Sequence, residues 1–205
     1  MSPVLLVTSS PRGESSRSSK VARELAEALS SAGSAKSIIH RDLGANPLPH
    51  IDAVFTSAIR KPAESRSEAE AAAAVLSDVL VDELLAADTV IIGTGLINFN
   101  IYSTLKSWID HIARSGKTFR YTEKGPEGLA TGKKVYLVVA SDGVYSQGPA
   151  TAMNHAIPYL KTVLAFLGMT DVEVVPVEGL AFGPEAVDKT MAEVQSRISK
   201  LALAA

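Results

Sequence analysis

The chain has 205 residues, a formal net charge of −2 and no cysteine. Its nearly balanced charge argues against a dedicated binder of nucleic acid or another polyanion. The absence of cysteine excludes disulfides, thiolate metal ligands and cysteine nucleophiles. Its four histidines are scattered without the spacing of metal ligands, so we expect no metal site.

Length and the N-terminal sequence indicate one domain, residues 1–205, without an export signal. A strand-like run begins within two residues of Met1, where a signal peptide would have a basic segment and an apolar core. No apolar run approaches the roughly 18–20 residues needed to cross a bilayer. We therefore expect a cytoplasmic protein with neither a nucleic-acid nor a membrane partner.

Strand-like and helix-like patterns alternate along the chain. Short runs typical of strands occur at residues 3–8, 37–41, 88–93, 134–140 and 172–177, of which the second is the most polar. Helical spacing or helix-start signals mark residues 21–33, 67–87, 103–114, 156–167 and 184–203. Residues 44–62 hold three prolines and look irregular, and residues 117–133 insert an excursion that we expect to form a small hairpin.

Five strands separated by helices predict an α/β fold with a doubly wound parallel sheet and helices on both faces. Parallel neighbours need helical crossovers, and these crossovers are right-handed. Open sheets of this kind bind ligands at the carboxyl ends of their strands. The loops after the first, third and fourth strands are therefore the candidate sites.

The first of these loops, residues 9–19, is rich in serine and contains Arg12 and Arg17. Hydroxyls and free N–H groups at a helix N-terminus form an anion site. The loop has neither the Gly-Lys-Ser/Thr of a P-loop nor a G-x-G-x-x-G fingerprint. We favour a mononucleotide phosphate held by serine hydroxyls, and the alternative is a solvated loop with one N-cap serine.

The second loop follows the third strand, and its Ile97-Asn98-Phe99 run is unusual for a mere connection. It offers amides between apolar walls, which suits a flat heteroaromatic ring with polar edges. The alternative is a helix entry with Phe99 as hydrophobic staple and Asn100 as cap. The third loop, residues 140–148, contains Gly143 and, taken alone, is best explained as an ordinary turn.

Together the three loops indicate FMN in a flavodoxin-like sheet of order 2-1-3-4-5, with the cofactor where the strand order reverses. A Ser-His-Asp hydrolase is poorly supported because no G-x-S-x-G elbow is present. His111 lies among apolar residues of a predicted helix, and we expect it to be a buried, hydrogen-bonded histidine rather than a ligand.

Several segments resemble the bacterial FMN-dependent NAD(P)H azoreductases, also described as quinone reductases. The most specific are Asn-Phe-Asn-Ile at 98–101, Thr-Phe-Arg-Tyr-Thr-Glu-Lys-Gly-Pro-Glu-Gly-Leu at 118–129 and Gly-Lys-Lys at 132–134. The serines at 9–10 and 16–18, Pro-Tyr-Leu at 158–160, Phe-Leu-Gly at 166–168 and Glu-Gly at 178–179 agree as well. The resemblance covers essentially the whole chain.

The resemblance implies a homodimer with FMN at the subunit interface. It implies ping-pong, two-electron hydride transfer from NADH or NADPH to a quinone or azo compound, carried by the flavin without a catalytic side chain. The hairpin around Phe119, Arg120 and Tyr121 is a candidate wall for the partner's site. The cofactor-binding residues that it implies are Ser10, Ser16, Arg17, Ser18, Leu96, Ile97, Asn98, Phe99, Ala140, Ser141, Asp142 and Gly143.

The chain departs from the family's usual pattern at two places beside the expected flavin. Gly95-Leu96-Ile97 stands where many members have Pro-Met and an aromatic residue, and Ala140-Ser141-Asp142-Gly143 stands where many have Ser-Arg-Gly-Gly. These changes bear on the packing and redox potential of the flavin and leave the fold intact. A flavin-binding electron-transfer or sensor module without NAD(P)H turnover is the alternative function, and a hydrolase is a third.

Overall fold

The computed structural model describes residues 2–33 and 37–204. Its main sheet has five parallel strands in the order β2-β1-β3-β6-β7. These strands are β1 (Val4–Thr8), β2 (Ile38–Asp42), β3 (Thr89–Gly95), β6 (Lys134–Ala140) and β7 (Asp171–Val177). Numbered among themselves, they have the predicted order 2-1-3-4-5, so the flavodoxin-like sheet is confirmed.

The predicted excursion is a hairpin outside the main sheet. Strands β4 (Phe119–Thr122) and β5 (Gly125–Gly128) pair antiparallel. The hairpin packs against the turn between α5 and β7, where a Cβ on Gly128 would come within 2.1 Å of the Gly168 backbone nitrogen. Only glycine allows the two backbones to approach this closely.

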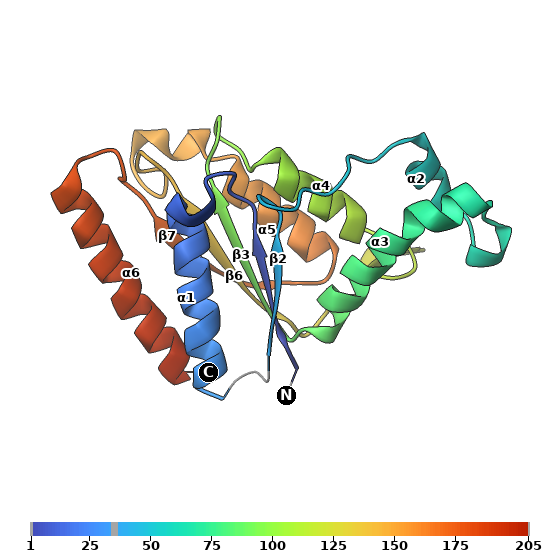
Figure 1. The fold of residues 1–205 in the computed structure, drawn as a ribbon, viewed down its shortest axis with the longest axis horizontal. Helices are drawn as coiled ribbons and strands as arrows, with labels where there is room; N and C mark the ends of the chain where they lie inside the picture. Colours follow the sequence, from blue (N-terminus) through green and yellow to red (C-terminus); the bar gives the residue numbers. More distant parts are fainter. Residues whose placement is uncertain (1, 34–36, 205) are drawn as a thin grey trace.

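Helices cover both faces of the sheet (Figure 1). The helices are α1 (Arg17–Ser31), α2 (Ala53–Ala58), α3 (Glu68–Ala86), α4 (Ser103–Ile112), α5 (Ala156–Phe166) and α6 (Pro184–Ala204). One hydrophobic cluster joins α1 and α6 to the sheet, and the other joins α3, α4 and α5 to the opposite face. On β3, Val90 and Ile92 face the second cluster while Ile91 faces the first, which explains the uninterrupted apolar run of that strand.

Serine side chains cap the starts of two helices. Ser67 and Glu70 form a capping box at the start of α3, and Ser16 caps α1 by accepting from the Ser19 N–H. The prediction that residues 44–62 are irregular was wrong in part, because helix α2 lies within them. Asp52 caps this helix by accepting from the Phe55 N–H at 2.7 Å. Short 3₁₀ turns span Gly13–Ser15, Ala63–Ser65 and Pro149–Met153.

None of the helices in residues 2–33 and 37–204 combines the length and apolar character needed to cross a lipid bilayer.

Candidate functional site

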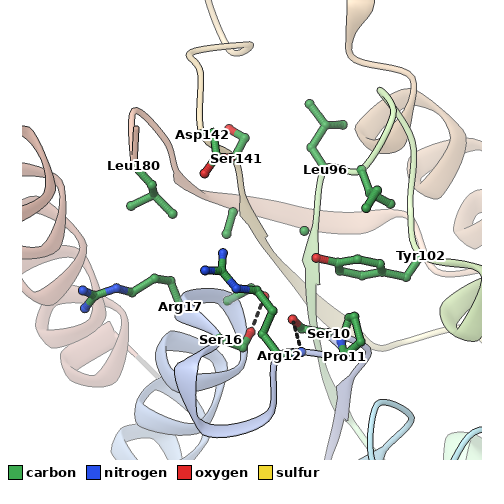
Figure 2. Close-up of a pocket in the computed structure, with 14 residues that line it drawn as sticks. Ser10, Pro11, Arg12, Ser16, Arg17, Leu96, Tyr102, Ser141, Asp142 and Leu180 are labelled. Carbon is green, nitrogen blue, oxygen red and sulfur yellow. Dashed lines mark hydrogen bonds between the residues drawn. The ribbon is translucent and has the colours of Figure 1, made fainter. Parts of the chain in front are cut away.

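A cavity of about 300 Å³ opens at the carboxyl ends of the parallel strands. Its wall comes from the loops after β1, β3, β6 and β7, which lie far apart in the sequence (Figure 2). The cavity is next to β1 and β3. The chain leaves β1 toward β2 on one side, and β3 lies on the other, so the order of the strands reverses here.

The first loop brings all four of its predicted residues, Ser10, Ser16, Arg17 and Ser18, to the cavity wall. The three serines are buried, and the Ser16 and Ser18 hydroxyls lie 3.2 Å apart. Among the described residues, the N–H groups of Arg17 and Ser18 have no hydrogen-bond acceptor, because they belong to the first turn of α1. Hydroxyls and unpaired N–H groups at a helix N-terminus are the donors that an anionic group prefers.

The first turn of α1 is fixed against the end of β3. Ser9 donates its N–H to the Gly93 carbonyl at 3.0 Å and its hydroxyl to the Thr94 hydroxyl at 3.0 Å. A Cβ on Gly93 would lie 2.9 Å from the Ala22 Cβ and 3.1 Å from the Ser18 carbonyl oxygen. The missing side chain at Gly93 therefore lets the helix approach the strand and places Ser18 at the cavity.

The second loop contains a tight two-residue turn. Ile97 and Asn100 exchange backbone hydrogen bonds of 2.8 and 2.9 Å, and the φ angles of Asn98 and Phe99 are +46° and +67°. Positive φ at both central positions is typical of a type I′ turn. Leu96 and Ile97 line the cavity, whereas Asn98 and Phe99 do not belong to its wall.

The turn also corrects the alternative interpretation of this loop. Tyr102, and not Asn100, is the N-cap residue of α4. Phe99 instead contacts the third loop, with its ring centroid 6.3 Å from that of Tyr145 in an edge-to-face arrangement. Strand β3 also extends to Gly95, two residues beyond the predicted end, because Gly95 still pairs with Ala140 of β6.

In the third loop, Ala140, Ser141 and Asp142 line the cavity and Gly143 does not. The segment after β7 holds this loop: Gly179, Leu180 and Ala181 donate their N–H groups to the carbonyls of Gly143, Ser141 and Asp142 at 3.1, 3.3 and 3.1 Å. The same contact brings the Leu180 side chain into the wall. Sequence reasoning missed Leu180 because no motif marks it.

Other wall residues that the sequence prediction did not include are Pro11, Arg12, Gly95 and Tyr102. Figure 2 shows the Arg12 guanidinium inside the ring of labelled residues, while that of Arg17 points away toward α6. The Tyr102 ring also points inward, over Gly95, where a Cβ would lie 2.7 Å from the tyrosine hydroxyl oxygen. The sequence did offer a signal that Arg12 belongs to the wall, because Arg12 lies in the serine-rich loop. It offered no signal for the contact between Gly95 and Tyr102.

His111 lies away from the cavity, beneath the loop before α2, and it is buried and hydrogen-bonded as predicted. Its Nε2 is 3.1 Å from the Pro49 carbonyl oxygen, and its ring lies 4.6 Å from that of Phe55. Within the described residues, no group of three or more histidine, aspartate or glutamate side chains is arranged to hold a metal ion.

The cavity thus has two chemically different ends. Serine hydroxyls, unpaired N–H groups and Arg12 form an anion-binding end, and Leu96 and Ile97 form an apolar end, whereas Leu180 lies across the cavity from Leu96, on the side of the Arg12 guanidinium (Figure 2). A ligand with a phosphate at one end and a flat ring at the other matches this arrangement, so the residues present fit a flavin mononucleotide.

Comparison with known proteins agrees with this geometry. A family model described as a flavodoxin-like fold matches residues 2–202. The chain is 65% identical to the FMN-dependent NADH:quinone oxidoreductase of Agrobacterium fabrum and 62% identical to that of Rhizobium johnstonii, in both cases over the whole of both chains.

Solved structures give the same result. The azoreductase from Bacillus anthracis str. Sterne superposes with a TM-score of 0.89 at 31% identity, covering 98% of this chain and 99% of that one. An FMN-dependent NADH-azoreductase from the Ames Ancestor strain, solved in complex with FMN, superposes with a TM-score of 0.86 at 29% identity, covering 98% and 100%. The chain therefore belongs to the flavodoxin-like FMN-dependent NADH:quinone oxidoreductases and azoreductases.

Proposed function

We propose that this protein is an FMN-dependent NAD(P)H oxidoreductase that reduces quinones and azo compounds. The observation that carries the proposal is the two-ended cavity at the point where the strand order reverses. It occurs in a chain 65% identical to a protein named as an FMN-dependent NADH:quinone oxidoreductase. A flavin-binding module without turnover would need the same cavity, but the names of these relatives do not favour it.

The anion-binding end would hold the phosphate through the hydroxyls of Ser10, Ser16 and Ser18 and the N–H groups of Arg17 and Ser18. Because α1 begins here, its dipole also favours a negative charge. When bound, FMN supplies two-electron hydride chemistry, and the protein orients it and excludes water.

The apolar end would flank the ring with Leu96 and Ile97 and border it with Ala140, Ser141 and Asp142. Asn98, Phe99 and Gly143 complete the proposed set from just outside the cavity wall. No side chain is proposed to act as a catalytic acid, base or nucleophile, because the flavin carries the reaction.

We further propose a homodimer with the cavity at its interface. Large apolar side chains are exposed on the loops around the cavity: Ile97 and Phe99 follow β3, Met153 follows β6, and Phe182, which is 66% exposed, follows β7. Tyr121, on the β4–β5 hairpin away from this chain's own cavity, is 73% exposed and would face the partner's site. Exposed apolar groups gathered near a site indicate a protein contact, and a partner would complete the cavity. We place the enzyme in the cytoplasm, with NADH or NADPH as its reductant.

An anaerobic stopped-flow experiment tests the function. The full chain is reconstituted with FMN, mixed with NADH or NADPH, and then mixed with a benzoquinone or an azo dye. We expect the yellow flavin colour to bleach with reductant and to return with each acceptor. A protein that stays colourless after reconstitution contradicts the cofactor assignment. A coloured protein that neither nicotinamide bleaches supports the module without turnover.

A further inference from the structure

We propose that Arg12, and not Arg17, is the side chain that recognises the charge of the flavin's phosphate and so selects FMN over riboflavin. This inference rests on the proposed function and adds to it a residue that determines cofactor specificity. The family resemblance implied Arg17, and not Arg12, among the cofactor-binding residues of this loop.

The first argument is the direction of the two side chains. Both arginines border the cavity, but in Figure 2 the Arg12 guanidinium lies between the first turn of α1 and the third loop, whereas the Arg17 guanidinium extends toward α6. Arg17 is the first residue of α1, so its main-chain N–H can face the cavity while its side chain lies outside. Arg17 would therefore act through its backbone, which a substitution leaves in place.

The second argument is that the Arg12 backbone is fixed while its guanidinium is unpaired. The Arg12 N–H donates to the Ser10 hydroxyl at 3.3 Å, and the Arg12 carbonyl accepts from the Ser15 N–H at 3.1 Å and hydroxyl at 2.8 Å. Among the described residues, no carboxylate lies within ion-pair distance of the Arg12 guanidinium. Nearby Glu14 pairs with Arg23 instead, at 3.0 Å.

The third argument is the charge of the remaining wall. The other donors at the anion-binding end are neutral hydroxyls and N–H groups, and Asp142 brings a carboxylate to the opposite wall. These neutral donors and the α1 dipole already favour a phosphate over the terminal hydroxyl of riboflavin, but none of them carries a full positive charge. A guanidinium offers two parallel donors and a full positive charge, which favour the phosphate dianion.

Flavin titrations of three variants test the proposal. The full chain, freed of bound flavin, is titrated with FMN and separately with riboflavin, and binding is followed by flavin fluorescence. For Arg12→Met we expect FMN affinity to fall about tenfold or more, as loss of a charged hydrogen bond implies, with riboflavin affinity unchanged. Arg12→Lys should recover part of the loss, because it restores the charge without the bidentate geometry.

Arg17→Met is the matched control, since it removes the same charge from the same loop. We expect it to leave both affinities nearly unchanged, apart from a small salt-sensitive effect on FMN. An unchanged ratio of FMN to riboflavin affinity in Arg12→Met, or an equal loss in Arg17→Met, would overturn the assignment to Arg12. In that case FMN binding and bleaching by NADH in the unaltered protein would still stand. If the unaltered protein binds neither flavin, the proposed function and this inference fail together.

Discussion

Within residues 2–33 and 37–204, Phe99 is the residue whose backbone departs furthest from what its side chain prefers. Its φ of +67° lies in the left-handed region, where a residue with a Cβ costs about 1 kcal/mol or more relative to glycine. The turn imposes this angle, and the Phe99 carbonyl is also held by the His155 N–H at 2.9 Å. Backbone strain of this kind gathers at functional sites, where the surrounding structure maintains it.

This strain predicts an unusual order of stabilities at position 99. Phe99→Gly should be more stable than Phe99→Ala by about 1 kcal/mol, because both lose the ring contact with Tyr145 but only glycine relieves the φ angle. Urea unfolding of the two variants measures the difference. Ser103, the exposed first residue of α4, is the control position. There the φ angle is helical, so Ser103→Ala should be more stable than Ser103→Gly. A Phe99→Ala variant as stable as Phe99→Gly would show that the turn relaxes.

At this scale the sequence predicted which loops reach the cavity but not how individual side chains point. The position of the serines after β1 and of the apolar residues after β3 at one cavity follows from the strand order alone. The directions of Arg12 and Arg17 depend on side-chain rotamers, which no periodicity encodes. The outward position of Asn98 follows from the type I′ turn, and a sequence of Asn-Phe, lacking the usual glycine, gives only a weak signal for that turn.

Among the elements, the start of α3 has a carboxylate, Glu70, that accepts more hydrogen bonds than a capping box alone provides. The Glu70 carboxylate accepts hydrogen bonds from the Lys61 ammonium at 2.6 Å, the Ser57 hydroxyl at 2.5 Å and the Ser67 N–H at 2.8 Å. These donors lower the pKa of Glu70 to about 2. The carboxylate thereby ties α2 and the loop that follows it to α3.

A pH-dependent loss of stability follows for this junction. An unfolded glutamate has a pKa near about 4.3, so Glu70 contributes its full stabilisation above about pH 5 and loses it as the pH falls toward about 2. Glu70→Gln should therefore unfold at lower urea concentration than the unaltered chain at pH 7, and the gap should narrow below about pH 4.5. Glu68→Gln, in the same first turn, is the control and should show a small gap. A gap that is constant from pH 7 to pH 3 would contradict the role of the charge.

Elements were predictable where burial dictates the pattern. The four apolar strands and the amphipathic α1 are recognisable from their residue patterns because both faces of the sheet are covered by helices. Helix α2 escaped prediction because six residues carry too few turns for a periodic pattern. The last residues of β3 were not predicted as strand because Gly93, Thr94 and Gly95 have the composition of a loop, although their backbones continue to pair with β6.

For the whole molecule, the decisive proposal is the homodimer. Met153→Asp would put a charge on the apolar surface near the cavity without touching its wall. We expect sedimentation velocity to show a shift from dimer toward monomer, because an unpaired buried charge disfavours association. Leu203→Asp, near the end of α6 and away from the cavity (Figure 1), should leave the dimer intact. A dimer that withstands Met153→Asp would place the interface elsewhere.

The alternation of strands and helices with the crossover rules predicted a doubly wound parallel sheet, and the interpretation of the three loops as an FMN site predicted its strand order. The interface could not be predicted in this way, because exposed side chains such as Phe182 and Tyr121 have no sequence pattern of their own. It entered only through the family resemblance.

The four-loop construction of the cavity has a consequence for folding. Residues 10–18, 95–102, 140–142 and 180 meet only after β1, β3, β6 and β7 have taken their places in the sheet. A fragment lacking the last strand would therefore have little affinity for flavin. Ligand that binds only the complete fold stabilises it by mass action, so cofactor supply would govern the resistance of the entire chain to proteolysis, from β1 to α6.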